Sequence, residues 1–284
     1  MLTNTFRHLP QVGPVAERRF WESGVHTWQD FDAADLLSIS AKRRSLWTEE
    51  LELSRERLDA RDAAWFAARL PLSEHWRLYE EFCDELLYFD IETTGTSPDF
   101  GAHITTIVTY DGRRVREYIY GENLRDFIDD IQPYRALVSF NGRCFDAPWI
   151  ESHFLTELPH AHIDLRFVWR GLKLRGGLKS IEKQLEINRD ELDGVDGYAA
   201  VLLWRRYEQS GDRRWLEALL AYNRADVLNL ELLLHEACRR ASRLTPFGYE
   251  PPPPRVASEP YLPDADITEF LEAYAAMRSG GYGY

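Results

Sequence analysis

The sequence predicts an α/β protein in which a helical N-terminal region precedes a domain built around a mixed five-stranded sheet. Three observations support this fold class. Apolar and aromatic residues recur at helical spacing over Trp47–Leu70, with no glycine or proline before Pro71. Three apolar segments with short connections follow from residue 86, and such connections favour antiparallel strands. Beyond residue 123, helical and extended patterns alternate, which is typical of α/β folds.

The first three predicted strands form an antiparallel meander. They cover Leu86–Ile91, Ile104–Tyr110 and Val115–Tyr120. The pair Asp111-Gly112 supplies the turn that closes the second strand.

Helices and strands then alternate. A short helix over Asn123–Ile131 stops before Pro133, and Pro148 lies in the first turn of a helix that reaches Leu158. The remaining predicted elements are strands at Ala136–Phe140 and Ile163–Val168, and helices at Leu178–Leu185, Tyr198–Gln209 and Asp212 to about Arg240. Three antiparallel strands followed by helix, strand, helix, strand and helix is the element order of the ribonuclease H-like fold.

The chain divides into three predicted parts. Residues 1–83 form the helical region and residues 84–242 the α/β domain. Residues 243–284 contain a stiff, proline-rich linker at Pro251–Pro254, a short amphipathic helix at Ile267–Met277 and a glycine-rich tail that we expect to be flexible.

Composition narrows the class of protein. Hydrophobic residues make up 44% and charged residues 29% of the chain, as in a soluble globular protein. No apolar run approaches the roughly 18 residues that span a bilayer, and Met1–Gly13 lacks the features of a secretory signal. We therefore expect a cytoplasmic protein without a membrane segment. Three widely separated cysteines indicate neither a disulfide framework nor a zinc site.

For nucleic-acid binding, the distribution of charge along the chain matters more than the net charge. A net charge of −13 argues against a non-specific nucleic-acid binder, which usually has a basic surface. The segment from Arg166 to Lys183, however, has six basic residues against one acid, Glu182. Such a local basic segment is sufficient for contacts to phosphate.

Asp90 and Glu92 form the first candidate cluster, in the segment Asp-Ile-Glu-Thr-Thr-Gly. Residues at i and i+2 of a strand point to the same face, so the two carboxylates repel each other unless a cation lies between them. Mg²⁺ and Mn²⁺ prefer such oxygen ligands. The alternative is that Asp90 caps a turn and Glu92 is solvated.

The second cluster, Asn141 to Asp146, lies between a predicted strand and a predicted helix. Functional groups are common at such junctions. An aspartate at a helix start is also favoured as an N-cap without any chemistry, so Asp146 has two interpretations.

The third cluster places Tyr222 and Asp226 at i and i+4 of a helix, so their side chains share one face. A phenol can then lie beside a metal-bound water while the carboxylate holds the metal. The alternative is a core tyrosine with a surface aspartate. Since apolar residues flank the pair, an unpaired aspartate there would be costly, and a metal or an arginine such as Arg224 would relieve that cost.

In this order the clusters resemble the three motifs of the DEDD superfamily of 3′–5′ exonucleases. The third motif has the tyrosine form, because the histidine form would place histidine where this chain has Ala221. Over residues 85–240 the chain also resembles ribonuclease H-like bacterial proteins of the YprB type, including the segments Gly177–Glu182 and Asp196–Tyr198.

The resemblance implies a site with two divalent cations, Mg²⁺ or Mn²⁺. Asp90, Glu92 and Asp226 would hold one cation, and Asp90 would also touch the second, with Asp146 helping through water. Tyr222 would orient the attacking water. Asp164 is either an accessory group near the cleft or an ordinary solvated residue. The expected contacts to nucleic acid are Thr93, Asn141, Arg170, Lys173, Arg175 and Lys179.

The expected function is a 3′–5′ exonuclease acting on nucleic acid, with single-stranded DNA favoured as partner. An exoribonuclease or a structure-specific endonuclease would use the same site. A catalytically silent nucleic-acid-binding module is a third hypothesis, and the presence of all four carboxylates and Tyr222 argues against it.

The N-terminal segment resembles a helix-hairpin-helix over Phe6–Gly13 and Gly24–Trp28. Gln11 stands where a glycine is usual, which weakens the backbone phosphate site and favours a degenerate or purely structural copy. Elsewhere, we expect His160 and His162 to be surface or edge residues, and Trp169 to be a core residue or a base-stacking one.

Overall fold

The computed structural model describes residues 1–33, 39–97, 101–187, 197–255 and 274. Its centre is a five-stranded sheet in the order β3-β2-β1-β4-β5. The strands are β1 (Leu86–Thr93), β2 (Ile104–Tyr110), β3 (Val115–Ile119), β4 (Ala136–Ser139) and β5 (Ala161–Asp164). The pairs β1–β2 and β2–β3 are antiparallel, whereas β1–β4 and β4–β5 are parallel. The structure therefore confirms the predicted mixed sheet and the ribonuclease H-like fold class.

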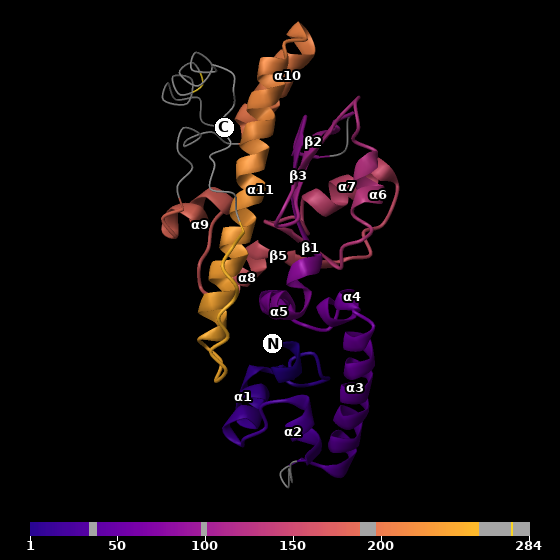
Figure 1. The fold of residues 1–284 in the computed structure, drawn as a ribbon, viewed down its shortest axis with the longest axis vertical. Helices are drawn as coiled ribbons and strands as arrows, with labels where there is room; N and C mark the ends of the chain where they lie inside the picture. Colours follow the sequence, from indigo (N-terminus) through magenta and orange to yellow (C-terminus); the bar gives the residue numbers. More distant parts are fainter. Residues whose placement is uncertain (34–38, 98–100, 188–196, 256–273, 275–284) are drawn as a thin grey trace.

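The sheet lies between two layers of helices, as Figure 1 shows. The helices of this domain are α6 (Asp126–Asp130), α7 (Asp146–Phe154), α8 (Leu165–Gly171), α9 (Leu178–Gln184), α10 (Gly197–Ser210) and α11 (Arg213–Ser242). Alternate residues of β1 point to opposite faces. Phe89 and Ile91 pack with Phe127 and Trp149 of α6 and α7, whereas Tyr88 belongs to the core that α11 covers. This alternation directs Asp90 and Glu92 towards α11.

The N-terminal region lies below the sheet in Figure 1. Its elements are η1 (Leu2–Asn4), α1 (Pro14–Glu22), α2 (Trp28–Ala33), α3 (Ala41–Asp59), α4 (Ala63–Ala67), η2 (Leu72–Leu78), α5 (Tyr79–Phe82) and η3 (Cys83–Glu85). One buried apolar cluster runs without interruption from Met1 through the side of the sheet that α11 covers. The predicted boundary at residue 83 thus falls within a shared core.

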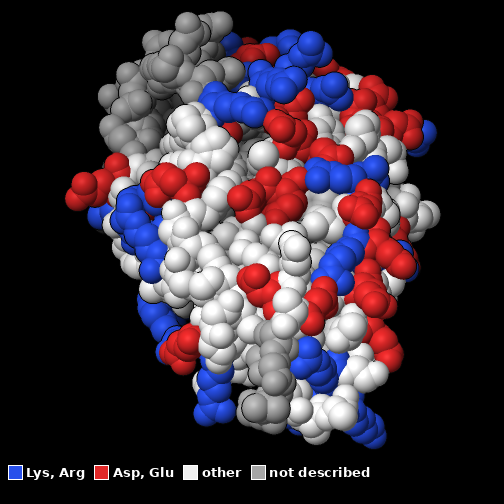
Figure 2. Space-filling model, turned by 60° about the horizontal axis from the view of Figure 1, so that its bottom comes forward, with Lys and Arg blue, Asp and Glu red and all other residues white. Residues whose placement is uncertain are grey.

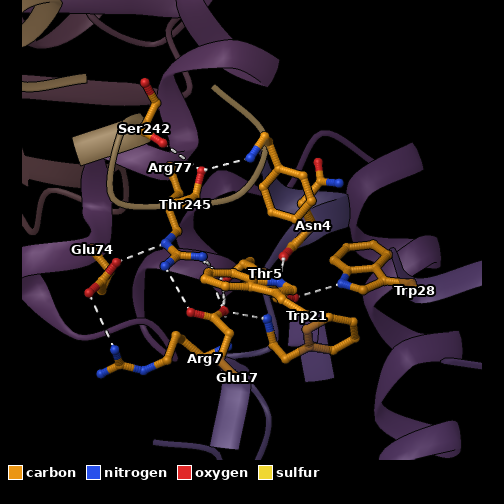
Figure 3. Close-up of polar contacts among 12 residues, drawn as sticks. Asn4, Thr5, Arg7, Glu17, Trp21, Trp28, Glu74, Arg77, Ser242 and Thr245 are labelled. Carbon is orange, nitrogen blue, oxygen red and sulfur yellow. Dashed lines mark hydrogen bonds and ion pairs between the residues drawn. The ribbon is translucent and has the colours of Figure 1, made fainter. Parts of the chain in front are cut away.

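A buried ion pair fixes this region internally, as Figure 3 shows. The Arg77 guanidinium donates to Glu17 at 2.9 Å and to the Thr5 hydroxyl at 2.7 Å. Glu17 also accepts the backbone N–H of Phe6 at 2.8 Å. Both charged side chains are buried: the Arg77 side chain is 4% exposed and the Glu17 side chain is 3% exposed. Such a pair is tolerated inside a protein only when its remaining donors and acceptors are also satisfied.

Three sequence predictions about elements are wrong in part. The helix expected over Trp47–Leu70 is broken, because Arg61 adopts a positive φ of 55° between α3 and α4. The helix expected to reach Leu158 ends at Phe154, because Leu155 adopts φ 52°. The strand expected over Ile163–Val168 ends at Asp164, whose carboxylate caps α8 by accepting the N–H of Arg166.

Other predictions fall largely outside the described residues. The helix expected at Ile267–Met277 lies outside them except for Tyr274, which is helical and buried, and the tail at residues 280–284 lies wholly outside. Among the residues that the structure describes, no helix combines the length and the apolar character needed to cross a membrane.

Candidate metal centre

Three carboxylates meet between β1 and α11. Asp90 and Glu92 come from the C-terminal half of β1, and Asp226 comes from the middle of α11. One oxygen atom from each of the three lies within 4.8 Å of the other two. Glu92 is 8% and Asp226 5% exposed, and Asp90 is half-buried. The structure therefore gathers residues that are up to 136 positions apart in sequence, as the difference 226 − 90 shows.

The electrostatics of this acidic trio favour a divalent cation. Burial raises the pKa of Glu92 well above its usual value, the Asp226 carboxylate raises it further, and the Lys179 ammonium opposes the rise. Repulsion between three clustered carboxylates disfavours the ionisation of all three unless a positive charge lies nearby. Hard oxygen donors are the ligands that Mg²⁺, Mn²⁺ and Ca²⁺ prefer, so the residues present fit such an ion.

Asp146 lies close to the trio but is not part of it. It is the first residue of α7 and 3% exposed. Phe145 occupies the N-cap position, so Asp146 is not the cap that one interpretation of the sequence expected. Burial raises the pKa of Asp146 to about 7, and the backbone N–H groups of Asp146 and Ile91 oppose the rise. The negative charge of Asp146 adds slightly to the raised pKa of Glu92, so Asp146 interacts electrostatically with the trio.

Tyr222 is buried on α11 one turn before Asp226 and is held by a lysine. The Lys179 ammonium donates to the Tyr222 hydroxyl at 2.5 Å and lies 4.1 Å from the centre of its ring. A second bond, from Asn229 of α11 to Glu182 at 2.8 Å, joins the same two helices. Helix α9 is therefore docked on α11 at two points, and one of them is the phenol.

Asp164 holds the loop that precedes Asp146. Its carboxylate accepts the backbone N–H groups of Asn141 at 2.8 Å, Arg143 at 3.1 Å and Arg166 at 3.0 Å. It is 1% exposed, so it is not a solvated residue, and it is not one of the three carboxylates that converge. Gly142 is needed in this loop, since a Cβ there would lie 2.0 Å from the Ser139 hydroxyl oxygen.

A cleft of about 630 Å³ opens beside the trio. Asp90, Asp226 and Tyr222 line it, together with four cationic side chains of the segment that contains α8 and α9, namely Arg166, Arg170, Arg175 and Lys179. Asn141 also lines the cleft. The predicted contacts Thr93 and Lys173 lie elsewhere: Thr93 is buried and donates to the Gly95 carbonyl at 2.6 Å, and Lys173 is exposed outside the cleft lining.

Sequence reasoning missed the contact that Asn223 makes to Asp90. Its side-chain amide donates to an oxygen of Asp90 at 2.7 Å, and it is fully buried. It stands inside the third motif, next to Tyr222, but no pattern in the sequence distinguishes it from a helix-surface asparagine. Its partner is 133 residues away, so only the packing of α11 on β1 reveals the contact.

Two further expectations are settled by burial. His162 lies in the edge strand β5, as one alternative expected, but it is 8% exposed and its ring Nε2 lies 2.7 Å from the Ser139 hydroxyl, so it is not a surface residue. Trp169 is fully buried, which supports the core interpretation over base stacking.

The N-terminal hairpin contains a residue other than glycine in a left-handed backbone conformation. Gln11 adopts φ 63°, the left-handed conformation for which glycine is usual, so the turn survives the substitution. Figure 2 brings this end of the molecule forward and shows basic and acidic side chains interspersed on the described residues of that face.

Comparisons with known proteins agree with the fold. The family model described as RNase_H superfamily matches residues 87–238. Over 174 residues, 54% of this chain, the sequence is 28% identical to the protein named "Uncharacterized protein YprB" of Bacillus subtilis (strain 168). This chain spans only 42% of the length of that relative. No solved structure shows a significant match.

Proposed function

This chain belongs to the RNase H superfamily, and from that premise we propose that it is a metal-dependent 3′–5′ exonuclease of the tyrosine-type DEDD class, acting on single-stranded DNA. The observation that carries the proposal is the meeting of Asp90, Glu92 and Asp226, whose oxygens lie within 4.8 Å of one another beside a cationic cleft. A superfamily domain alone hosts many functions, so the argument rests on this site.

In this proposal Asp90, Glu92 and Asp226 hold one divalent cation, and Asp90 and Asp146 serve a second. When bound, such cations stabilise negative charge at the phosphoryl group and lower the pKa of water. The carboxylates themselves supply negative charge, and two of them, Glu92 and Asp226, do so from buried positions. Burial, and after it repulsion from the Asp226 carboxylate, raises the pKa of Glu92, and a bound cation would relieve both costs.

The remaining residues bind and orient the substrate. Tyr222 lines the same cleft as Asp90 and Asp226, and the hydrogen bond from Lys179 restricts the orientation of its phenol. A group held in this way can orient an attacking water and accept its hydrogen bond. Arg166, Arg170 and Arg175 line the cleft and can contact successive phosphates of a strand. The direction of degradation follows the class that the motifs resemble.

The test is degradation of end-labelled oligonucleotides by the purified protein with Mg²⁺, Mn²⁺ or chelator. We expect Mn²⁺- or Mg²⁺-dependent shortening from the 3′ end of single-stranded DNA, abolished by Asp90→Asn and by Asp226→Asn. Asp212→Asn is a matched control, because Asp212 caps the exposed start of α11 and aspartate and asparagine cap equally well. Unchanged activity in both site variants would refute the proposed centre.

The same assay separates the roles of the residues and the candidate substrates. Tyr222→Phe should slow cleavage by about 10²-fold or more, as loss of a proton-handling group does, while leaving residual metal-dependent activity. Matched RNA, double-stranded DNA and internally labelled circular substrates decide between the exonuclease and the ribonuclease or endonuclease alternatives. Absence of activity on every substrate would favour a silent binding module.

A further inference from the structure

Asn223 joins the elements that carry the acidic trio. It belongs to α11, three residues before Asp226, so the two side chains share a helix face. Its amide nitrogen donates to Asp90 Oδ2 at 2.7 Å. Its amide oxygen accepts from the Thr106 hydroxyl at 3.1 Å. Thr106 in turn lies directly opposite Glu92 in the β1–β2 pairing. One side chain thus connects β1, β2 and α11 at the point where the carboxylates converge.

The chemistry of the partners fixes the orientation of this amide. An ionised carboxylate only accepts hydrogen bonds, so the Asn223 side chain must present its NH₂ group to Asp90. The oxygen then faces Thr106, whose hydroxyl can donate. Asn223 and Thr106 are both fully buried. A rotated amide would turn its oxygen towards the Asp90 carboxylate, so that two acceptors face each other, and would take the acceptor away from the buried Thr106 hydroxyl.

We propose that Asn223 is the positioning residue of the metal centre: it orients the Asp90 carboxylate towards a divalent cation without adding charge. This inference rests on the proposed function. A lysine or arginine at this place would also bind Asp90, but its positive charge would oppose the cation. The neutral amide fixes the direction of the carboxylate and leaves the negative charge of the trio intact. Groups that orient a metal ligand in this way typically contribute about 10–100-fold to metal affinity.

The test is direct Mn²⁺ binding, measured by the paramagnetic resonance signal of the free ion in a titration of the whole chain. Asn223→Ala should raise the Kd for Mn²⁺ by about 10–100-fold. Thr106→Val keeps the volume of the side chain but removes the donor that fixes the amide, so it should raise the Kd by a smaller factor. Asn229→Ala is the matched control, because it removes another asparagine–carboxylate bond of 2.8 Å from the same helix; its Kd should stay within about twofold of wild type, far below the effect of a lost metal-orienting group.

Activity provides a second readout that a merely structural role would not give. If Asn223 acts through metal affinity, the Mn²⁺ concentration for half-maximal cleavage should rise in Asn223→Ala, and saturating Mn²⁺ should recover most of the rate. Thermal melting without metal shows whether the variant folds, and Thr106→Val carries the test if Asn223→Ala does not.

The outcomes separate this inference from the proposed function. If wild type binds Mn²⁺ and both Asn223→Ala and Thr106→Val bind it equally well, the positioning role is refuted while the nuclease proposal stands. If wild type binds Mn²⁺ with the predicted order of affinities but cleaves no nucleic acid, the positioning role stands and the nuclease proposal falls. If wild type binds no Mn²⁺, the metal centre and the role of Asn223 are refuted together.

Discussion

Two buried histidines, His8 and His162, each bind a serine hydroxyl inside the fold. The His8 ring Nε2 lies 2.9 Å from Ser54 Oγ in the N-terminal core, and His162 makes the equivalent contact to Ser139 beneath the loop before Asp146. Burial lowers the pKa of both imidazoles to about 3, since the charged ring would lose its water, and nearby arginines add to the effect. Both rings are therefore neutral in the folded protein near neutral pH.

We predict that His8 makes the protein less stable in mild acid. The pKa falls from 6.5 in the unfolded chain to about 3 in the fold, so the stability contributed by the neutral ring is complete above pH 6.5 and is lost as the pH falls towards 3. Relative to wild type, His8→Gln should flatten the pH dependence of the free energy of unfolding by up to about 1.4 kcal/mol per pH unit in this window. Urea unfolding from about pH 4 to pH 7 measures it; parallel curves would contradict the prediction.

For single residues, the sequence predicts which side chains of one strand or helix share a face better than it predicts contacts between elements. The i, i+2 spacing of Asp90 and Glu92 fixes their common face, and the structure agrees. The i, i+4 spacing does the same for Tyr222 and Asp226. Nothing in the local sequence shows that Lys179 contacts the Tyr222 phenol, because that contact depends on how α9 docks on α11.

Helices α8 and α9 form the cationic wall of the cleft. Arg170 lies in the last turn of α8, and Arg175 lies in the connection to α9. Both line the cleft, whereas Lys173, two residues before Arg175, is exposed outside it with a positive φ of 70°. Arg175 and Lys173 have the same charge, so only their positions in the structure show which of them lines the cleft.

We predict that Arg175 and Lys173 differ in their contribution to nucleic-acid binding. In an Asp90→Asn background that prevents cleavage, Arg175→Ala should weaken binding of single-stranded DNA. It should also flatten the slope of log K against log salt by about 0.7, the value for one phosphate contact on a single strand. Lys173→Ala, the neighbouring control, should leave the slope unchanged. Fluorescence anisotropy at several salt concentrations measures both, and equal slopes in the two variants would show that the cleft wall is not the binding track.

The predictions of elements are correct where the hydrophobic periodicity is long, and they are wrong where single residues adopt an unexpected backbone conformation. Helix α11 was expected from Asp212 to about Arg240 and runs from Arg213 to Ser242, since its apolar face repeats over many turns. The start of α8 was mistaken for strand, because the apolar residues after Asp164 suit either state until the cap is known. Arg61 and Leu155 end helices in the left-handed region, which neither residue type signals.

At the scale of the whole molecule, one continuous buried apolar cluster joins the N-terminal region to the sheet and α11. Helix α4 and η2 pack on β5, and η2 also packs on α8 and α11. Trp76 and Phe82 are buried with residues of the sheet and α11 in a single cluster. The His75 ring is 3.0 Å from the backbone carbonyl of His162, next to β5 residues that lead to Asp164. Residues before 83 therefore pack on β5, whose Asp164 holds the loop that precedes Asp146.

We predict that breaking the buried Glu17–Arg77 pair destabilises the entire molecule and not only its N-terminal end. Arg77→Met removes the partner of a carboxylate that is 3% exposed, so it should cost about 3–5 kcal/mol of unfolding free energy. Arg214→Met breaks an ion pair of similar length, 2.7 Å to Asp212, on the surface and should cost less than about 1 kcal/mol. Because the core is shared, tryptophan fluorescence and far-ultraviolet circular dichroism should shift together to lower denaturant in Arg77→Met, as one transition. A two-step curve, in which only part of the signal moves, would mean that residues 1–83 unfold independently and that the sheet stands without them.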